Sequence, residues 1–228
     1  DFKTCTSVND VIKYLSEYYG KLDGIIEKKK GEGRLFSSYP IFLFRGQPSC
    51  SYRLLPCAFR EDNLYINENN FFNKLYKNHC SEFKNDNSAF DRLARMQHYG
   101  LPTRLLDVTV NPLIALYFAC QPCYEAKKDG SKVIDKSDAS LFIFLLSESC
   151  IKDSNSDIVT ILPNLSRMNY NEKKSLLSEN DKETEGKLSY LISKENPLFS
   201  GEFLNINDLP DFVFVEPKMD IERIKIQS

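Results

Sequence analysis

The chain has 228 residues, of which 42% are hydrophobic, and a formal net charge of -2 from 30 Lys and Arg against 32 Asp and Glu. This composition excludes a molecule-wide electrostatic attraction to nucleic acid or membranes and favours a domain with a substantial core. No stretch offers the roughly 18 apolar residues of a membrane span, and the N-terminus lacks a signal-like apolar run. Seven cysteines without regular spacing favour reduced thiols. We therefore expect a cytoplasmic protein without a membrane partner. Because it starts at Asp1 and ends at Ser228, we also expect an excised or processed chain.

The N-terminal residues 7–19 carry apolar side chains at helical spacing. Ser7 with Asp10 is typical of a helix-capping pair. The charged sequence KKKGEGR at 28–34 predicts a solvated linker. We therefore expect residues 1–35 to form a helix followed by a linker.

Two apolar segments follow the linker. Residues 39–46, YPIFLFRG, predict a short strand that ends in Arg45 and Gly46. Residues 68–83 repeat aromatic and aliphatic side chains at helical steps. His79 lies beside that apolar stripe, so a structural role is favoured for it.

The densest motif of the chain is MQHYGLPTRLLDVTVNPLIALYFAC at residues 96–120. Gly100 predicts the end of a preceding helix, because glycine readily adopts left-handed dihedral angles. Residues 103–108 then predict a short strand. Asn111 as N-cap and Pro112 at the first helical position predict a second helix. This helix is apolar on all sides, which predicts that most of its surface is buried.

Three charged side chains and a hydroxyl surround this turn. Burying Arg104 and Asp107 costs several kcal/mol per ion unless they are paired, so we expect both to meet Arg45 where the strands end. Each guanidinium could bind a phosphate or carboxylate in a bidentate manner, or could form an ion pair with Asp107 that holds the strands together. Asp107 and Thr109 could equally bind a ribose or cap the helix.

The rings and thiols of the same motif allow further roles. His98 and Tyr99 could stack on a base or nicotinamide, with His98 as a proton shuttle, or His98 could simply satisfy a helix-end carbonyl. Cys120 and Cys123 form a CxxC at a helix C-terminus, where the partial negative charge disfavours a thiolate. Zinc would need two further ligands at suitable spacing, so we expect no metal site.

The remaining chain contains fewer motifs. The segments 125–139 and 140–146 predict a polar hairpin or loop followed by a buried strand. The region 158–200 includes a highly charged stretch that predicts a mobile surface arm. Segments 211–217 and 221–227 predict a final hairpin.

Three motifs resemble the FRG domain, a bacterial family named after a tripeptide. They are FRG at 44–46, QHYGLPTRLLDVTVNPLIALYFA at 97–119 and RIKIQ at 223–227. The resemblance extends from residue 40 to the C-terminus, although Val108 stands where a tryptophan is usual and the family pattern continues past Gln227. It implies a mobile, often defence-associated domain, which we assign to residues 36–228 as one globular unit.

The order of the elements is also similar to that of ADP-ribosyltransferases. In that family an arginine holds a cofactor phosphate or ribose, a hydroxyl braces it, and a late carboxylate stabilises the ribosyl centre. This likeness assigns the first role to Arg45, the second to Thr109 and the third to Glu222 or Gln227. The predicted fold is α+β, with a mixed or antiparallel central sheet and helices around it, as an ADP-ribosyltransferase-like domain would have.

We therefore predict a bacterial defence or toxin protein that binds a nucleotide-like small molecule. Its most concrete version is NAD-dependent ADP-ribosyl transfer to a nucleic-acid or protein acceptor. The candidate catalytic residues are His98, Tyr99, Glu222 and Gln227. The candidate cofactor-binding residues are Arg45, Gly46, Arg104, Asp107 and Thr109. The alternatives are a non-catalytic module that senses nucleotides, nucleic-acid ends or phage components, and a structural domain whose polar motif is an interior hydrogen-bond network.

Overall fold

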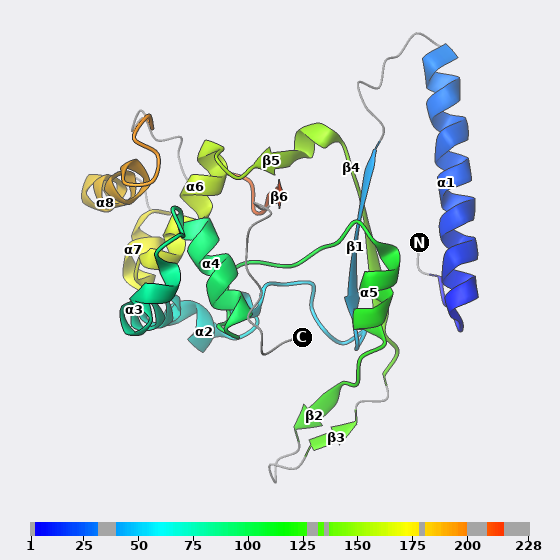
Figure 1. The fold of residues 1–228 in the computed structure, drawn as a ribbon, viewed down its shortest axis with the longest axis horizontal. Coiled ribbons are helices and arrows are strands. Elements are labelled where there is room, and N and C mark those ends of the chain that lie inside the picture. Colours follow the sequence, from blue (N-terminus) through cyan, green and yellow to red (C-terminus); the bar gives the residue numbers. More distant parts are fainter. Residues whose placement is uncertain are drawn as a thin grey trace. The chain divides into compact units, whose positions relative to one another are not determined.

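The computed structural model describes residues 3–31, 40–126, 132–134, 137–177, 181–199 and 209–216. Helices and strands are mixed in the α+β manner that the sequence predicts (Figure 1). The chain divides into two compact units, Asp1–Ile41 and Phe42–Ser228. None of the described helices combines the length and apolar character that crossing a membrane requires.

The first unit contains one helix, α1 (Val8–Gly31). Its start is capped as predicted, because the Asp10 amide donates to Ser7 Oγ at 3.1 Å and the Ser7 amide donates to Asp10 Oδ2 at 2.9 Å. The helix continues into the predicted linker as far as Gly31, since the three lysines there are good helix formers. The predicted linker residues 32–34 lie outside the described residues.

The second unit holds the other described elements, with β1 starting at the boundary between the units. Its α-helices are α2 (Asp62–Ile66), α3 (Glu68–Asn78), α4 (Ala89–His98), α5 (Pro112–Ala119), α6 (Asp157–Asn164), α7 (Tyr170–Ser175) and α8 (Lys182–Ser193). Its 3-10 helices are η1 (Cys57–Phe59), η2 (Cys80–Phe83), η3 (Glu148–Cys150) and η4 (Leu165–Arg167). The strands are β1 (Ile41–Gln47), β2 (Tyr124–Ala126), β3 (Lys132–Ile134), β4 (Ser140–Leu146), β5 (Ile151–Asp153) and β6 (Phe214–Glu216).

The described strands form three pairs. β1 pairs with β4, β2 with β3, and β5 with β6. The β2–β3 pair is antiparallel and confirms the predicted hairpin after α5. The β5–β6 pair is parallel, so β6 is paired with a strand about sixty residues earlier in the chain. The partner predicted for β6, at residues 221–227, lies outside the described residues.

The end of α4 is built as the sequence predicts. Gly100 has a φ of 82°, its amide donates to the Gln97 carbonyl at 2.9 Å, and the Leu101 amide donates to the Met96 carbonyl at 3.0 Å. These two bonds form a Schellman motif, which needs a residue with positive φ at the position of Gly100. The turn brings Leu101 against the apolar cluster that contains Met96.

The predicted strand at 103–108 is wrong. This segment is a loop that ends in a single antiparallel bridge between Phe44 and Thr109, with backbone hydrogen bonds of 2.7 and 2.9 Å. Backbone groups of this loop form hydrogen bonds outside a sheet. The Ala58 amide donates to the Thr103 carbonyl, and the Leu105 amide donates to Thr103 Oγ1. Leu105 also packs against the apolar cluster of α3 and α4.

Helix α5 starts as predicted, with Asn111 Oδ1 accepting from the Leu113 amide at 2.9 Å and Pro112 at the first helical position. The helix lies unusually close to β1. A Cβ atom placed on Gly46 would be 1.7 Å from the Ala115 carbonyl oxygen and 2.7 Å from the Ala119 amide nitrogen. Only glycine fits at this position, because any side chain would overlap the helix backbone.

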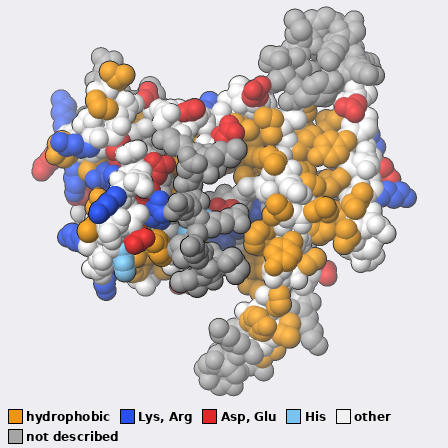
Figure 2. All heavy atoms as spheres, viewed as in Figure 1, with side chains coloured by type: hydrophobic (Ala, Val, Ile, Leu, Met, Phe, Trp, Pro, Cys, Tyr) orange, Lys and Arg blue, Asp and Glu red, His pale blue; other side chains and the backbone are white. Residues whose placement is uncertain are grey.

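The predicted burial of α5 on most sides is wrong. Only its small residues Ala115 and Ala119 are buried, on the face toward β1. Its large apolar side chains are exposed to between 46% and 62%: Leu113, Ile114, Tyr117 and Phe118. Hydrophobic side chains accordingly gather over α5 on the surface (Figure 2). The helix packs through its smallest residues, which lets the backbones approach and leaves the larger residues outside.

The prediction of a mobile arm at 158–200 is also wrong. Most of this region forms α6, η4, α7 and α8 around an apolar cluster. Leu188 and Ile192, four residues apart on α8, are fully buried there with Met168. Lys174, Lys182 and Glu183 of the charged stretch are exposed, as amphipathic packing requires, whereas Lys173 is buried.

The close packing of β1 on α5 gives a direct prediction. Gly46→Ala should lower the free energy of unfolding by about 3 kcal/mol or more, because the new methyl group overlaps the α5 backbone. Gly186→Ala is the matched control, because Gly186 lies within α8 with no atom within 4 Å of the added carbon. That change should stabilise by about 0.5–1 kcal/mol. Urea denaturation measures both values, and equal effects would contradict the proposed packing.

Candidate functional site

A cavity of about 160 Å³ lies beside the end of β1. Its wall mixes polar and apolar side chains from the two motifs of the sequence. The lining residues are Arg45, Cys57, Arg60, Gln97, Leu101, Thr103, Leu105, Leu106 and Asp107.

Four parts of the second unit build this cavity. Arg45 comes from β1, Cys57 from η1, Arg60 from the C-cap of η1, and Gln97 from the last turn of α4. The loop after α4 supplies the rest. The first and second sequence motifs therefore meet in space, as predicted for Arg45 and Asp107.

A chain of polar contacts crosses the cavity wall. Thr103 Oγ1 donates to Gln97 Oε1 at 2.5 Å, and Gln97 Nε2 donates to Asp107 Oδ2 at 2.8 Å. Arg45 Nη1 donates to the Asp107 backbone carbonyl at 2.6 Å. The amide of Gln97 thus has a fixed orientation, and it holds the Asp107 carboxylate at the rim.

The charge of Arg45 is only weakly compensated. Among the described residues, no carboxylate lies within ion-pair distance of its guanidinium, and its buried Nε has no hydrogen-bond acceptor. Burial lowers the pKa of Arg45, the Asp107 carboxylate opposes this shift, and the like charge of Arg60 adds to it. An anion in the cavity would relieve both the desolvation and the repulsion.

Arg104 does not join this site. Its Nε and Nη2 donate to the two carboxylate oxygens of Glu68 at 2.8 and 2.6 Å, and its Nη1 donates to the Leu162 carbonyl at 3.0 Å. Lys173 Nζ binds the same Glu68 carboxylate at 2.5 Å. The predicted meeting of Arg104 with Arg45 and Asp107 is therefore wrong, because Glu68 on α3 provides a nearer and buried partner.

The Glu68 cluster is a complete ion network within the core. Glu68 and Lys173 are 3% and 6% exposed, so nearly all of their surface is removed from water. Burial by itself would raise the pKa of Glu68, but the attraction and hydrogen bonds of Arg104 and Lys173 outweigh it and hold the pKa below its ordinary value. This cluster joins α3, α7 and the loop after α4, so its role is structural.

The predicted ring pair lies outside the cavity lining. Tyr99 is exposed, its hydroxyl donates to Glu82 Oε2 at 3.0 Å, and its ring contacts Phe83. Partly buried His98 is the last residue of α4 and is not part of the cavity wall. Gln97, one residue before His98, occupies the position that the prediction gave to the rings.

Gly46 and Thr109 do not line the cavity but lie next to the segments that form it. Gly46 permits the close contact with α5. Thr109 pairs with Phe44 through its backbone, and its hydroxyl accepts from the Asn111 amide at 3.1 Å rather than bracing Arg45. Glu222 and Gln227, the predicted late catalytic positions, lie outside the described residues.

Of the residues that line the cavity, only Arg45 and Asp107 were predicted as site residues; the cation and the hydrogen-bonding side chains that the prediction missed are Arg60, Gln97 and Thr103. Gln97 and Thr103 belong to the dense motif itself, and their six-residue separation spans the helix-ending turn at Gly100. That turn could have indicated that both side chains face the same space. Arg60 follows a 3-10 helix that gives no clear sequence signal.

No metal cluster forms in the part of the chain that the structure describes, where three or more His, Cys, Asp or Glu side chains nowhere gather to hold an ion. The two thiols of the CxxC differ in environment. Cys120 is exposed, whereas Cys123 is buried with its sulfur 2.6 Å from the Tyr52 hydroxyl. These contacts suit Cys123 to a packing role.

The comparison with known families agrees with this placement. Residues 40–129 match the family model described as the FRG domain. Every residue that lines the cavity lies within this matched segment. No curated protein and no solved structure matches the chain.

The Glu68 cluster predicts a specific loss of stability. Glu68→Gln leaves Arg104 and Lys173 without a buried counter-charge, so the free energy of unfolding should fall by about 3–5 kcal/mol. The exposed Glu61→Gln should change it by less than about 0.5 kcal/mol.

The same cluster predicts a pH dependence. Because the folded pKa of Glu68 lies below its ordinary value of 4.5, its contribution is present above 4.5 and is lost as pH falls through the folded pKa. Denaturation curves measured at decreasing pH should show this loss in the native chain and a smaller slope in Glu68→Gln. Equal slopes in both proteins would contradict the network.

Proposed function

We propose that the FRG domain of this chain binds a nucleotide-like ligand by an anionic group, at the cavity formed by Arg45 and Arg60. The observation that carries the proposal is the guanidinium of Arg45 in the cavity wall, which has no carboxylate at ion-pair distance among the described residues and a buried Nε without an acceptor. A partly buried cation without a paired carboxylate is unfavourable. A phosphate would supply the missing charge, and the planar fork of arginine fits its oxygens.

The volume of the cavity fits one phosphate group of the ligand rather than the whole ligand. Its volume of about 160 Å³ is smaller than the roughly 300–1,000 Å³ of sites that enclose a whole ligand. A phosphate would fill it, while the sugar and base would lie across the rim. Exposed Asp107, held by Gln97, is placed there to accept from a ribose hydroxyl.

Binding is the function that the cavity favours over ADP-ribosyl transfer. Neither His98 nor Tyr99 lines the cavity, and the hydroxyl of Tyr99 is already bound to Glu82. Glu222 and Gln227, to which the late role was assigned, lie outside the described residues and do not bear on this comparison. NAD as cofactor, a nucleic-acid or protein acceptor, and a defence or toxin role in the cytoplasm stay predictions.

Calorimetric titration with AMP, ADP-ribose and NAD tests the binding proposal. Arg45→Gln should weaken the binding of all three by about tenfold or more, the usual effect of losing a charged hydrogen bond. Arg60→Gln should weaken it less, because Arg60 is exposed. The control is Arg53→Gln, which removes an exposed arginine outside the cavity wall. Unchanged affinity in Arg45→Gln, with the native melting temperature, would refute the site.

Incubation with NAD separates binding from transfer. A binding module leaves NAD intact, so chromatography should detect no nicotinamide after incubation with the chain and candidate acceptors. Release of nicotinamide that depends on Arg45 would contradict a purely binding role and would favour ADP-ribosyl transfer at the same cavity.

A further inference from the structure

A second cavity, of about 400 Å³, lies among the helices of the second unit. Side chains of α3, α4, η4 and the C-terminal end of α8 form its wall. It shares no residue with the Arg45 cavity, and part of its wall lies beyond the segment that matches the FRG domain. The lining residues are Phe72, Asn73, Tyr76, Lys77, Arg92, Arg167, Lys194 and Glu195.

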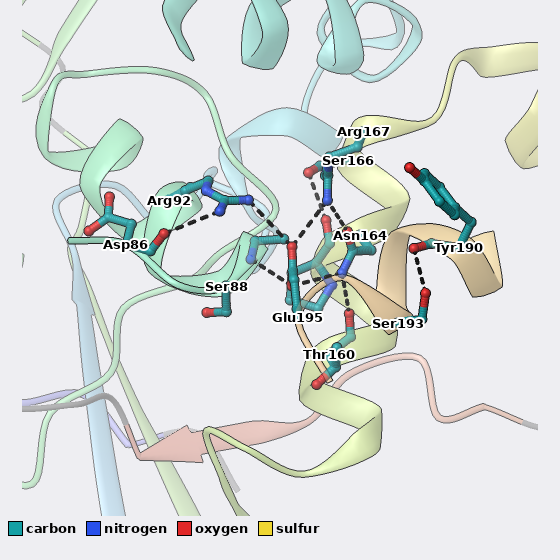
Figure 3. A network of polar contacts seen from close by, with 12 residues as sticks. Asp86, Ser88, Arg92, Thr160, Asn164, Ser166, Arg167, Tyr190, Ser193 and Glu195 are labelled. Carbon is teal, nitrogen blue, oxygen red and sulfur yellow. Dashed lines mark hydrogen bonds and ion pairs between the residues drawn. The ribbon is translucent and has the colours of Figure 1, made fainter. Parts of the chain in front are cut away.

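A buried carboxylate organises the cavity (Figure 3). The side chain of Glu195 is 4% exposed. Its Oε2 accepts from the Ala89 amide at 2.9 Å and from Asn164 Nδ2 at 3.0 Å. Its Oε1 accepts from Arg92 Nη1 at 3.4 Å and from Arg167 Nη1 at 3.1 Å. Each carboxylate oxygen of Glu195 therefore accepts two hydrogen bonds. Glu195 positions the two arginines and is not available as a base.

The cavity wall carries more positive than negative charge. Four cationic side chains face one carboxylate: Lys77, Arg92, Arg167 and Lys194 against Glu195. Lys77 and Lys194 form no ion pair with any described residue, although Lys194 lies over the Tyr190 ring. The buried Nε of Arg92 lacks an acceptor within the described part of the chain. One carboxylate cannot neutralise this set, so an excess of positive charge remains.

The pKa of Arg167 shows that this arrangement of charges disfavours its protonated form. Burial lowers the pKa of Arg167, Glu195 opposes the shift, and the neighbouring charge of Arg92 adds to it. Arg92 and Arg167 share the Oε1 atom of Glu195, so their like charges lie close together, and a second anion would reduce the repulsion between them. Such under-compensated, partly buried cations are typical of binding sites.

We propose that this cavity binds the phosphate groups of a small phosphorylated molecule. Arg92 and Arg167 present guanidinium groups, while the exposed Lys77 and Lys194 add two ammonium charges. This combination suits a multiply charged phosphate better than a single carboxylate. Phe72 and Tyr76 give the same wall an apolar part, and the volume falls within the usual range for a small-molecule site.

Titration of the full chain with inorganic pyrophosphate tests this site. Lys77→Gln with Lys194→Gln removes two cavity charges without touching the contacts of Glu195. The matched control is Lys74→Gln with Lys182→Gln, which removes the same charge from α3 and α8 at exposed positions outside the wall. The cavity variant should bind pyrophosphate about tenfold or more weakly, and the control should bind like the native chain. Binding should also weaken as salt is added.

To distinguish the two cavities, the pyrophosphate titrations of the cavity variant and of the control variant are repeated in the Arg45→Gln background. If the cavity variant still binds pyrophosphate more weakly than the control without Arg45, the second site is supported. The proposal is overturned if the native chain shows no saturable binding, if both lysine variants lose affinity equally, or if Arg45→Gln abolishes binding by itself.

Discussion

The contact between β1 and α5 at Gly46 is the constraint on which the Arg45 cavity depends. The strand lies so close to the helix that a methyl group would overlap the Ala115 carbonyl. Since successive side chains of a strand point to opposite faces, packing Gly46 against α5 turns Arg45 to the other side, where it binds the Asp107 carbonyl. The bridge from Phe44 to Thr109 fixes the loop that carries Asp107. The glycine of the FRG tripeptide is therefore structural, and it determines where the arginine points.

The buried charges of the second unit fall into two groups. Glu68 is fully paired with Arg104 and Lys173, and this network stabilises the fold. Arg45 in one cavity and Arg92 in the other each have a buried Nε without an acceptor among the described residues. Because a buried donor without an acceptor is unfavourable, these two guanidinium groups identify where an anionic ligand would stabilise the protein. Both proposals rest on this difference.

The sequence predicted the local features that depend on a few neighbouring residues. The end of α4 at Gly100 and the start of α5 at Asn111 follow from backbone chemistry within one turn, and both are confirmed. Apart from the contact between Arg45 and Asp107, features that depend on distant partners were not predicted. Arg104 binds a glutamate thirty-six residues earlier, and the exposure of α5 follows from the strand that packs on its alanines. The helices after residue 157 were mistaken for an arm because charge obscured the spacing of Leu188 and Ile192.

The central claim is that a ligand phosphate binds between Arg45 and Arg60, with the sugar toward Asp107. A crystal structure of the full chain with AMP tests it most directly. The account predicts phosphate oxygens within hydrogen-bond distance of the Arg45 guanidinium and a ribose hydroxyl at the Asp107 carboxylate. AMP bound elsewhere on the molecule, with the Arg45 guanidinium paired to a carboxylate of the chain itself, would contradict it.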